Sequence, residues 1–226
     1  MIIDNFAKLD LKLVNKLNEI INSLGTLTEL DLSGFKGIQI VPDSMLHYSS
    51  DGNTKDKMIL LPKNKTQEYC KNENYSVLKS TIYHELCHVD LANKLPNLHN
   101  LHNKYIIEEN YVKAFTIMIY IEYIAHLKSI KYETLDTQKN FFDSINKKDW
   151  DFTDECDKII FIKSSPYIIS RDINNIYINS FINDELRKNI LEVQKELKKI
   201  YDNEYIDEYY VLNSLENIVS KYISND

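Results

Sequence analysis

Glycine and proline are scarce in this sequence, with four of each among 226 residues. Both residues interrupt helices, so their scarcity favours long helices over a fold of many strands and turns. Arginine is scarcer still, because only Arg171 and Arg187 occur. Arginine suits the bidentate recognition of bases and phosphates better than lysine does. The formal net charge of −7 also repels a phosphate backbone, so we do not expect nucleic acid as a partner.

The three cysteines, Cys70, Cys87 and Cys156, are too few for a disulfide framework in a chain of this length. The N-terminus lacks the basic flank and apolar run of a secretory signal. The longest apolar stretch, residues 114–125, is too short to span a bilayer and contains Glu122. We therefore expect a cytoplasmic protein that has no membrane partner.

An apolar fraction of 43% allows a sizeable core, and we expect a single domain over residues 1–226. Apolar side chains recur at helical spacing over residues 10–24, where a glycine ends the predicted helix. Two short β-strands are predicted at residues 37–41 and 57–61, each followed by a proline. The polar segment 49–54 between them predicts a hairpin-type connection.

A helix is predicted from about residue 74 to residue 93, because its apolar side chains form one stripe. Residues 93–103, with a proline and several asparagines, are expected to form a loop. A second long helix is predicted over residues 106–130. It is apolar on nearly all sides, as a central buried helix should be.

The pattern is weaker in the C-terminal third. Residues 141–145 are expected to be helical, and residues 158–163 predict a strand or a buried helical turn. Two clearer helices are predicted at 184–201, capped by Asp184, and at about 205–223. The sequence thus predicts an additional C-terminal helical part over residues 184–224.

The segment His84-Glu85-Leu-Cys-His88 lies within the helix predicted over residues 74–93. Histidines four residues apart share one face of a helix, so their imidazole nitrogens can bind one tetrahedral metal ion. Zinc lowers the pKa of a bound water, and Glu85 stands where a general base can take its proton. The motif therefore predicts one Zn²⁺, with His84 and His88 as ligands and Glu85 as the catalytic residue.

Catalytic zinc usually has three protein ligands, so one more is needed. A metzincin-type third histidine is excluded, because Leu91 and Lys94 occupy the positions that would have to be glycine and histidine. His99 and His102 follow the motif in the predicted loop and could fold back, as in the SprT-like proteases. They lack the His-Gly pattern of that family.

Glu108 and Glu109 lie at a thermolysin-like distance after the motif, but at the predicted start of a helix acidic residues need no metal to explain them. Glu122 lies among apolar residues in the middle of the same predicted helix. A carboxylate buried there costs free energy unless it is paired or metal-bound. Glu122 is therefore the preferred third ligand, with pairing to His126 as the alternative.

The motif followed by Glu122-Tyr-Ile-Ala125 resembles short gluzincin-type zinc metallopeptidases of bacteria, which are often associated with prophages and mobile elements. This resemblance covers about residues 37–130, which would form the catalytic core. It implies an α+β, zincin-like fold, mostly helical overall. A small twisted sheet would pack on the active-site helix, and a later helix would deliver the third ligand.

Five further residues have weaker interpretations. Asp90 is predicted to be solvated near the helix end, with support of a ligand histidine as the alternative. His126 is either a group that orients Glu122 or an ordinary helix histidine. Cys87 is expected to be a small buried hydrophobe. Tyr167 and Arg171, expected between helices, are candidates for stabilising an oxyanion.

These features together predict a zinc-dependent metallopeptidase that hydrolyses a protein or peptide substrate. The strand at residues 57–61 is expected to be the sheet edge along which an extended substrate lies. Three alternatives remain: a zincin-like binding or regulatory protein that has lost catalysis, a toxin-like protease acting on a host protein, and a helical adaptor whose motif is accidental. The oligomeric state is left open by the sequence.

Overall fold

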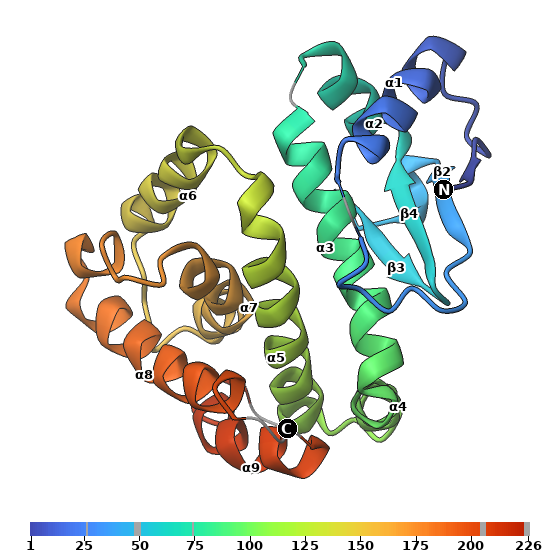
Figure 1. Ribbon diagram of the computed structural model, residues 1–226. Helices are drawn as coiled ribbons and strands as arrows, with labels where there is room; N and C mark the ends of the chain where they lie inside the picture. The colour runs from blue at the N-terminus through green and yellow to red at the C-terminus, as the bar shows by residue number, and fades with distance from the viewer. Residues whose placement is uncertain (26, 48–50, 74, 204–206, 224–226) are drawn as a thin grey trace. The chain divides into compact units, whose positions relative to one another are not determined.

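The computed structural model describes residues 1–226 except 26, 48–50, 74, 204–206 and 224–226. Helices dominate, and the described residues also form one small mixed sheet, which confirms the α+β class (Figure 1). The chain divides into two compact units. The first comprises residues 1–94 and 128–134, and the second comprises residues 95–127 and 135–226. None of the described helices has both the length and the apolar character needed to cross a membrane.

The sheet belongs to the first unit and has four strands in the order β1-β2-β4-β3. The strands are β1 (Ile3–Asp4), β2 (Gly37–Val41), β3 (Asn53–Lys55) and β4 (Met58–Pro62). β2 pairs in parallel with both β1 and β4, whereas β3 is antiparallel to β4. Both strands predicted from the sequence, β2 and β4, are thereby confirmed.

The predicted hairpin between β2 and β4 is wrong, because parallel strands cannot be joined by a hairpin turn. The short 3-10 helix η1 (Asp43–Met45) and strand β3 lie between them, while residues 49 and 50 of the predicted turn lie outside the described residues. The hairpin joins β3 to β4 instead. Its two turn residues, Asp56 and Lys57, have φ of 50° and 61°, as a type I′ turn requires.

The position predicted for β4 is also wrong. β4 is an interior strand, and β3 forms the edge of the sheet on that side. Two β4 side chains, Ile59 and Leu61, are fully buried, as are Ile38 and Ile40 of β2. A continuous apolar strand of this kind is typical of a sheet interior rather than of an exposed edge.

Helices α1 (Leu11–Asn22), α2 (Lys63–Lys71) and α3 (Tyr75–Lys94) complete the core of the first unit, and α3 packs against β3 and β4 (Figure 1). The Asp10 side chain caps α1 by accepting a hydrogen bond of 2.8 Å from the Lys12 amide. Both α1 and α3 confirm helices predicted from apolar spacing. The start predicted for α3, residue 74, lies outside the described residues.

A short later segment, residues 128–134, also belongs to the first unit. It contains the 3-10 helix η2 (Ile130–Tyr132), which packs against α3. The Tyr132 hydroxyl donates a hydrogen bond of 2.6 Å to the Leu24 carbonyl oxygen, and Lys131 pairs with Glu29 at 2.9 Å. These contacts connect the segment to parts of the chain about a hundred residues earlier.

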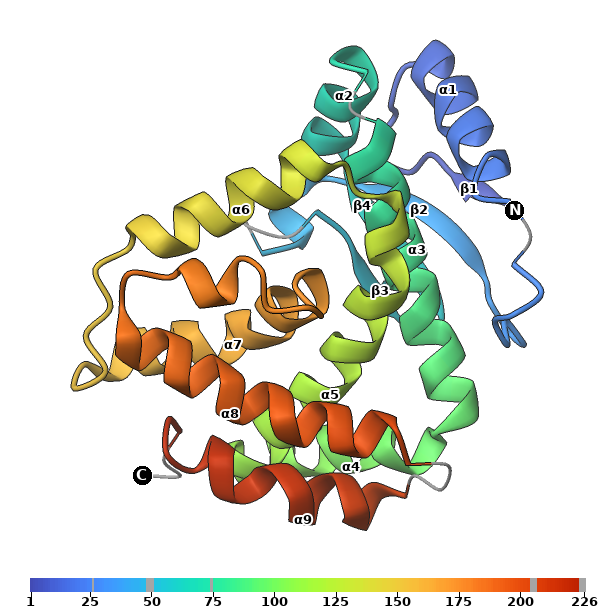
Figure 2. The ribbon, with the colours of Figure 1, turned by 60° about the vertical axis from the view of Figure 1, so that its left-hand side comes forward.

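The second unit is entirely helical in its described residues. Its helices are α4 (Pro96–Ile107), α5 (Tyr111–Ser129), α6 (Leu135–Lys147), α7 (Glu155–Arg171), η3 (Ile178–Ser180), α8 (Asp184–Tyr201) and α9 (Glu208–Val219). The last two residues of α5, 128 and 129, belong to the first unit. α8 and α9 lie side by side (Figure 2). A buried apolar stripe runs along α8 and is formed by Leu186, Ile190, Val193 and Leu197.

Two of the predicted boundaries in the second unit are wrong. Residues expected to form a loop at 93–103 belong instead to α3 and α4. Pro96 occupies the first turn of α4, where its missing amide hydrogen costs nothing. The predicted long helix begins later, at Tyr111, because Glu109 has φ of 56° and ends the preceding helical run.

The remaining predictions for the second unit are mostly confirmed. Residues 141–145 lie in α6, and residues 158–163 lie in α7, which settles the choice between strand and helix. The cap of α8 is Asn183 rather than Asp184, since the Asn183 side chain accepts from the Leu186 amide at 2.8 Å. The last helix begins at Glu208, and its predicted start at 205 lies outside the described residues.

Candidate metal centre

The two motif histidines lie on α3, whose apolar stripe faces the core of the first unit. Leu78, Ile82 and Leu86 are at most 1% exposed, so the helix has one fixed rotation about its axis. His84 and His88 are four residues apart on a neighbouring face. The burial of the stripe therefore sets the direction in which both imidazoles point.

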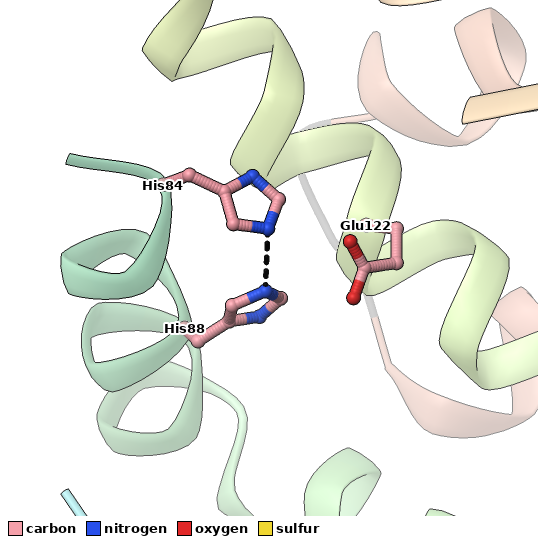
Figure 3. Close-up of side chains that lie close together, drawn as sticks. All are labelled: His84, His88 and Glu122. Carbon is pink, nitrogen blue, oxygen red and sulfur yellow. Dashed lines mark hydrogen bonds between the residues drawn. The ribbon is translucent and has the colours of Figure 1, made fainter. Parts of the chain in front are cut away.

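The His84 and His88 rings meet through their Nε2 atoms, which are 2.9 Å apart (Figure 3). The rings are nearly perpendicular, at 81°, and their centroids are 4.6 Å apart. Two nitrogens bound to one tetrahedral zinc at 2.0–2.1 Å would be roughly 3.3 Å apart. The observed spacing therefore suits a shared ion after a small adjustment of either side chain.

Glu122 lies in the middle of α5, as predicted, and its neighbours Tyr123, Ile124 and Ala125 are at most 4% exposed. The Glu122 side chain itself is 28% exposed, so it is less buried than the sequence suggested. Its Oε2 atom lies 3.4 Å from Nε2 of His126, one turn later. The contact expected from the alternative interpretation of Glu122 is thus present in the structure.

The ligand set predicted from the sequence consists of His84 and His88 on α3 of the first unit and Glu122 on α5 of the second, all three drawn in Figure 3. Two imidazole nitrogens and one carboxylate oxygen make up the donor set of many catalytic zinc sites.

The competing third ligands lie on α4 or directly after it. His99 and His102 are on α4 rather than in a loop, and burial together with His99 lowers the pKa of His102. Glu108 is the residue that ends α4, and Glu109 follows it with positive φ. Both glutamates are exposed and neither stands at the start of α5, so the helix-dipole explanation predicted for them is wrong.

Glu85 is held by the edge strand β3. The single hydroxyl hydrogen of Thr54 is shared between two acceptors, Oε2 of Glu85 at 2.7 Å and the Glu85 carbonyl oxygen at 3.0 Å. Glu85 is 6% exposed. A Cβ atom at Gly52 would lie 2.9 Å from Cγ2 of Thr81 and 3.3 Å from Cγ of Glu85, so glycine permits the close approach of this segment to α3.

Thr54 is a residue that sequence reasoning missed. No spacing rule connects it to Glu85, which lies 31 residues later. The signal is the hairpin turn at Asp56 and Lys57, because this turn places β3 at the sheet edge beside α3.

The prediction of a solvated Asp90 is wrong, because this side chain is completely buried. It pairs with Lys94 at 2.7 Å and Lys128 at 2.9 Å, and it accepts a hydrogen bond of 2.7 Å from the Asp31 amide. Burial alone would raise the pKa of Asp90, but these three donors outweigh it and hold the pKa below its usual value. Asp90 therefore fastens α3 to two other segments of the first unit.

Replacing Asp90 with Asn is expected to lower the free energy of unfolding by about 2 kcal/mol, because hydrogen bonds to a charged group contribute about 1.5–3 kcal/mol. The measurement is urea denaturation at pH 7. Asp56→Asn is the matched control, since Asp56 is exposed in a turn where asparagine is equally suitable. Equal stability of the two variants would contradict the assigned role of Asp90.

Cys87 is fully buried, as predicted, and burial raises the pKa of its thiol to about 12. Tyr167 and Arg171 lie on α7 rather than between helices. The Tyr167 ring contacts the His126 ring, with centroids 3.5 Å apart. His126 therefore contacts both Tyr167 and Glu122 within the second unit.

Comparison of the chain with protein-family models, curated proteins and solved structures gives no match.

Proposed function

We propose that this protein is a zinc-dependent metallopeptidase of the gluzincin type, built on a zincin-like fold. The observation that carries the proposal is the arrangement on α3. Two imidazole nitrogens lie 2.9 Å apart, and the residue after the first histidine, Glu85, has its carboxylate held by the sheet edge. A helix with only a structural role needs neither the paired histidines nor the fixed base.

The donor set fits zinc better than calcium or magnesium. Calcium and magnesium prefer oxygen ligands, whereas zinc accepts imidazole nitrogen and carboxylate oxygen together. His84, His88 and Glu122 would hold the ion. Three protein ligands leave a fourth position for water or substrate, which distinguishes a catalytic zinc site from a structural one.

Zinc, when bound, lowers the pKa of a water molecule and polarises the peptide carbonyl. The Glu85 carboxylate accepts the proton of the attacking water and passes it to the leaving amine, as a general base and then a general acid. The Thr54 hydroxyl keeps Oε2 of Glu85 in a fixed position during both transfers. His84 and His88 would hold the ion through imidazole nitrogens, and Glu122 would supply a carboxylate that reduces the net charge there.

An extended peptide is the substrate that the sheet edge suits. β3 rather than β4 is the strand that can pair with an added chain, because β4 already has neighbours on both sides. Thr54 belongs to β3 and bonds to Glu85, so a peptide paired with β3 would lie next to the general base.

The proposal is tested by metal analysis and peptide cleavage. Protein purified without chelator is expected to contain about one zinc per chain and to cleave members of a broad peptide library, detected by mass spectrometry. Chelation should abolish cleavage, and added zinc should restore it. Absence of zinc, with none regained on titration, would contradict the metal site. Zinc binding without cleavage would contradict the proposed peptidase activity and favour the alternative of a zincin-like binding protein.

A further inference from the structure

A chain of contacting side chains within the second unit leads from the carboxylate of Glu122 through His126 and Tyr167 to Arg171. His126 is 6% exposed, and its Nε2 atom lies 3.4 Å from Oε2 of Glu122. The His126 ring also contacts the Tyr167 ring at a centroid distance of 3.5 Å and an angle of 45°. The imidazole therefore contacts both a carboxylate on its own helix and a ring from α7.

Arg171 holds Tyr167 in place. Its guanidinium lies 5.0 Å from the centroid of the Tyr167 ring and 4.8 Å from that of Phe141. Its Nη1 atom also donates a hydrogen bond of 3.3 Å to the Tyr167 carbonyl oxygen. Because a guanidinium is attracted to the faces of aromatic rings, Arg171 connects α6 and α7 through the two rings.

We propose that His126 is a positioning residue, clamped by Tyr167 and Arg171, that orients the Glu122 carboxylate for metal binding. This inference rests on the proposed function, because it assigns to Glu122 the role of a zinc ligand. It goes further by naming the residues on which the strength of that ligand depends.

The physical reason is the freedom of a glutamate side chain. Glu122 is 28% exposed and has three rotatable bonds, so an unsupported carboxylate would sample many positions that cannot bind a metal. A neighbour that restricts this freedom before binding increases affinity without contributing a ligand. Residues that support metal ligands in this way typically change metal affinity 10–100-fold when they are removed.

His126 is well placed for this role because i and i+4 side chains share a helix face. Its ring cannot turn away easily, since Tyr167 covers it. The chain contains only two arginines, and one of them fixes this stack.

Two substitutions at position 126 distinguish the contribution of the ring nitrogen to zinc affinity from the contribution of the ring. His126→Phe keeps a ring against Tyr167 but removes the nitrogen, and it is expected to weaken zinc binding 10–100-fold. His126→Gln keeps a nitrogen at a similar distance from the backbone, and it is expected to recover most of the lost affinity. Affinity is measured by competition with a coloured zinc chelator, and the absorption spectrum of the Co²⁺ form reports the ligand geometry.

A third variant, Tyr167→Leu, loosens the clamp at a partly exposed position and is expected to weaken zinc binding about three- to tenfold. It also keeps the inference testable if His126→Phe fails to fold. His99→Phe is the matched control, because it makes the same replacement at an exposed position of the same unit and should leave affinity unchanged.

The outcomes distinguish this inference from the proposed function. Wild-type zinc affinity and an unchanged Co²⁺ spectrum in both His126→Phe and Tyr167→Leu would overturn the positioning role while leaving the metal site intact. Failure of the wild-type protein to bind zinc would instead overturn the proposed function.

Discussion

Replacing Glu85 with Gln is expected to lower kcat/KM for peptide hydrolysis by about 10²–10⁴-fold, the usual contribution of a general base. The amide has nearly the shape of the carboxylate and can still accept the hydrogen bond from Thr54, but it cannot take a proton from water. Zinc content should stay at its wild-type value, because Glu85 is not one of the proposed ligands. The measurements are steady-state cleavage of a library-derived peptide and metal analysis of the same preparation.

Glu68→Gln is the matched control for this variant. Glu68 is exposed on α2 of the same unit, so removing its charge should change neither zinc content nor activity. An active Glu85→Gln protein would contradict the general-base assignment. An inactive protein that has also lost zinc would place Glu85 in the metal site rather than in the proton transfer.

Replacing Glu122 with Gln is expected to weaken zinc binding by roughly 10²–10³-fold. Four-ligand structural zinc sites bind with about 10–16 kcal/mol, which corresponds to roughly 2.5–4 kcal/mol for each ligand. Each 1.4 kcal/mol is a factor of ten. Because Gln keeps the length of the side chain and α5 keeps its apolar neighbours, the fold should survive, which circular dichroism checks.

Glu108→Gln is the control for Glu122→Gln and also tests the alternative ligand. Glu108 is exposed at the end of α4, so its substitution should leave zinc affinity unchanged. Loss of affinity in Glu108→Gln together with unchanged affinity in Glu122→Gln would move the third ligand to Glu108.

Much of the candidate site could be predicted because it depends on local patterns. The spacing of Leu78, Ile82 and Leu86 predicts α3 and the face on which the histidines lie. Glu122 was singled out by its apolar neighbours in α5. Both inferences use only the 3.6-residue helical period, which the sequence displays directly.

The features that were predicted wrongly depend mostly on contacts between residues that are far apart in the sequence. The parallel pairing of β2 with β4 cannot be predicted from the sequence of either strand. Both strands are apolar along their length, and such a sequence suits parallel and antiparallel pairing equally. The burial of Asp90 was missed because one of its partners, Lys128, lies 38 residues later. Pro96 was misleading for a different reason, since proline is common both in loops and in the first turn of a helix.

The burial of the thiols has a practical consequence for measuring local unfolding. Cys70 and Cys87 are buried in the first unit, where burial raises the pKa of each, whereas Cys156 is exposed on α7 of the second unit. A maleimide reagent attacks accessible thiolates, so in the folded protein it should label Cys156 first. The slower labelling of Cys70 and Cys87 would then report how often the first unit opens, without any engineered probe.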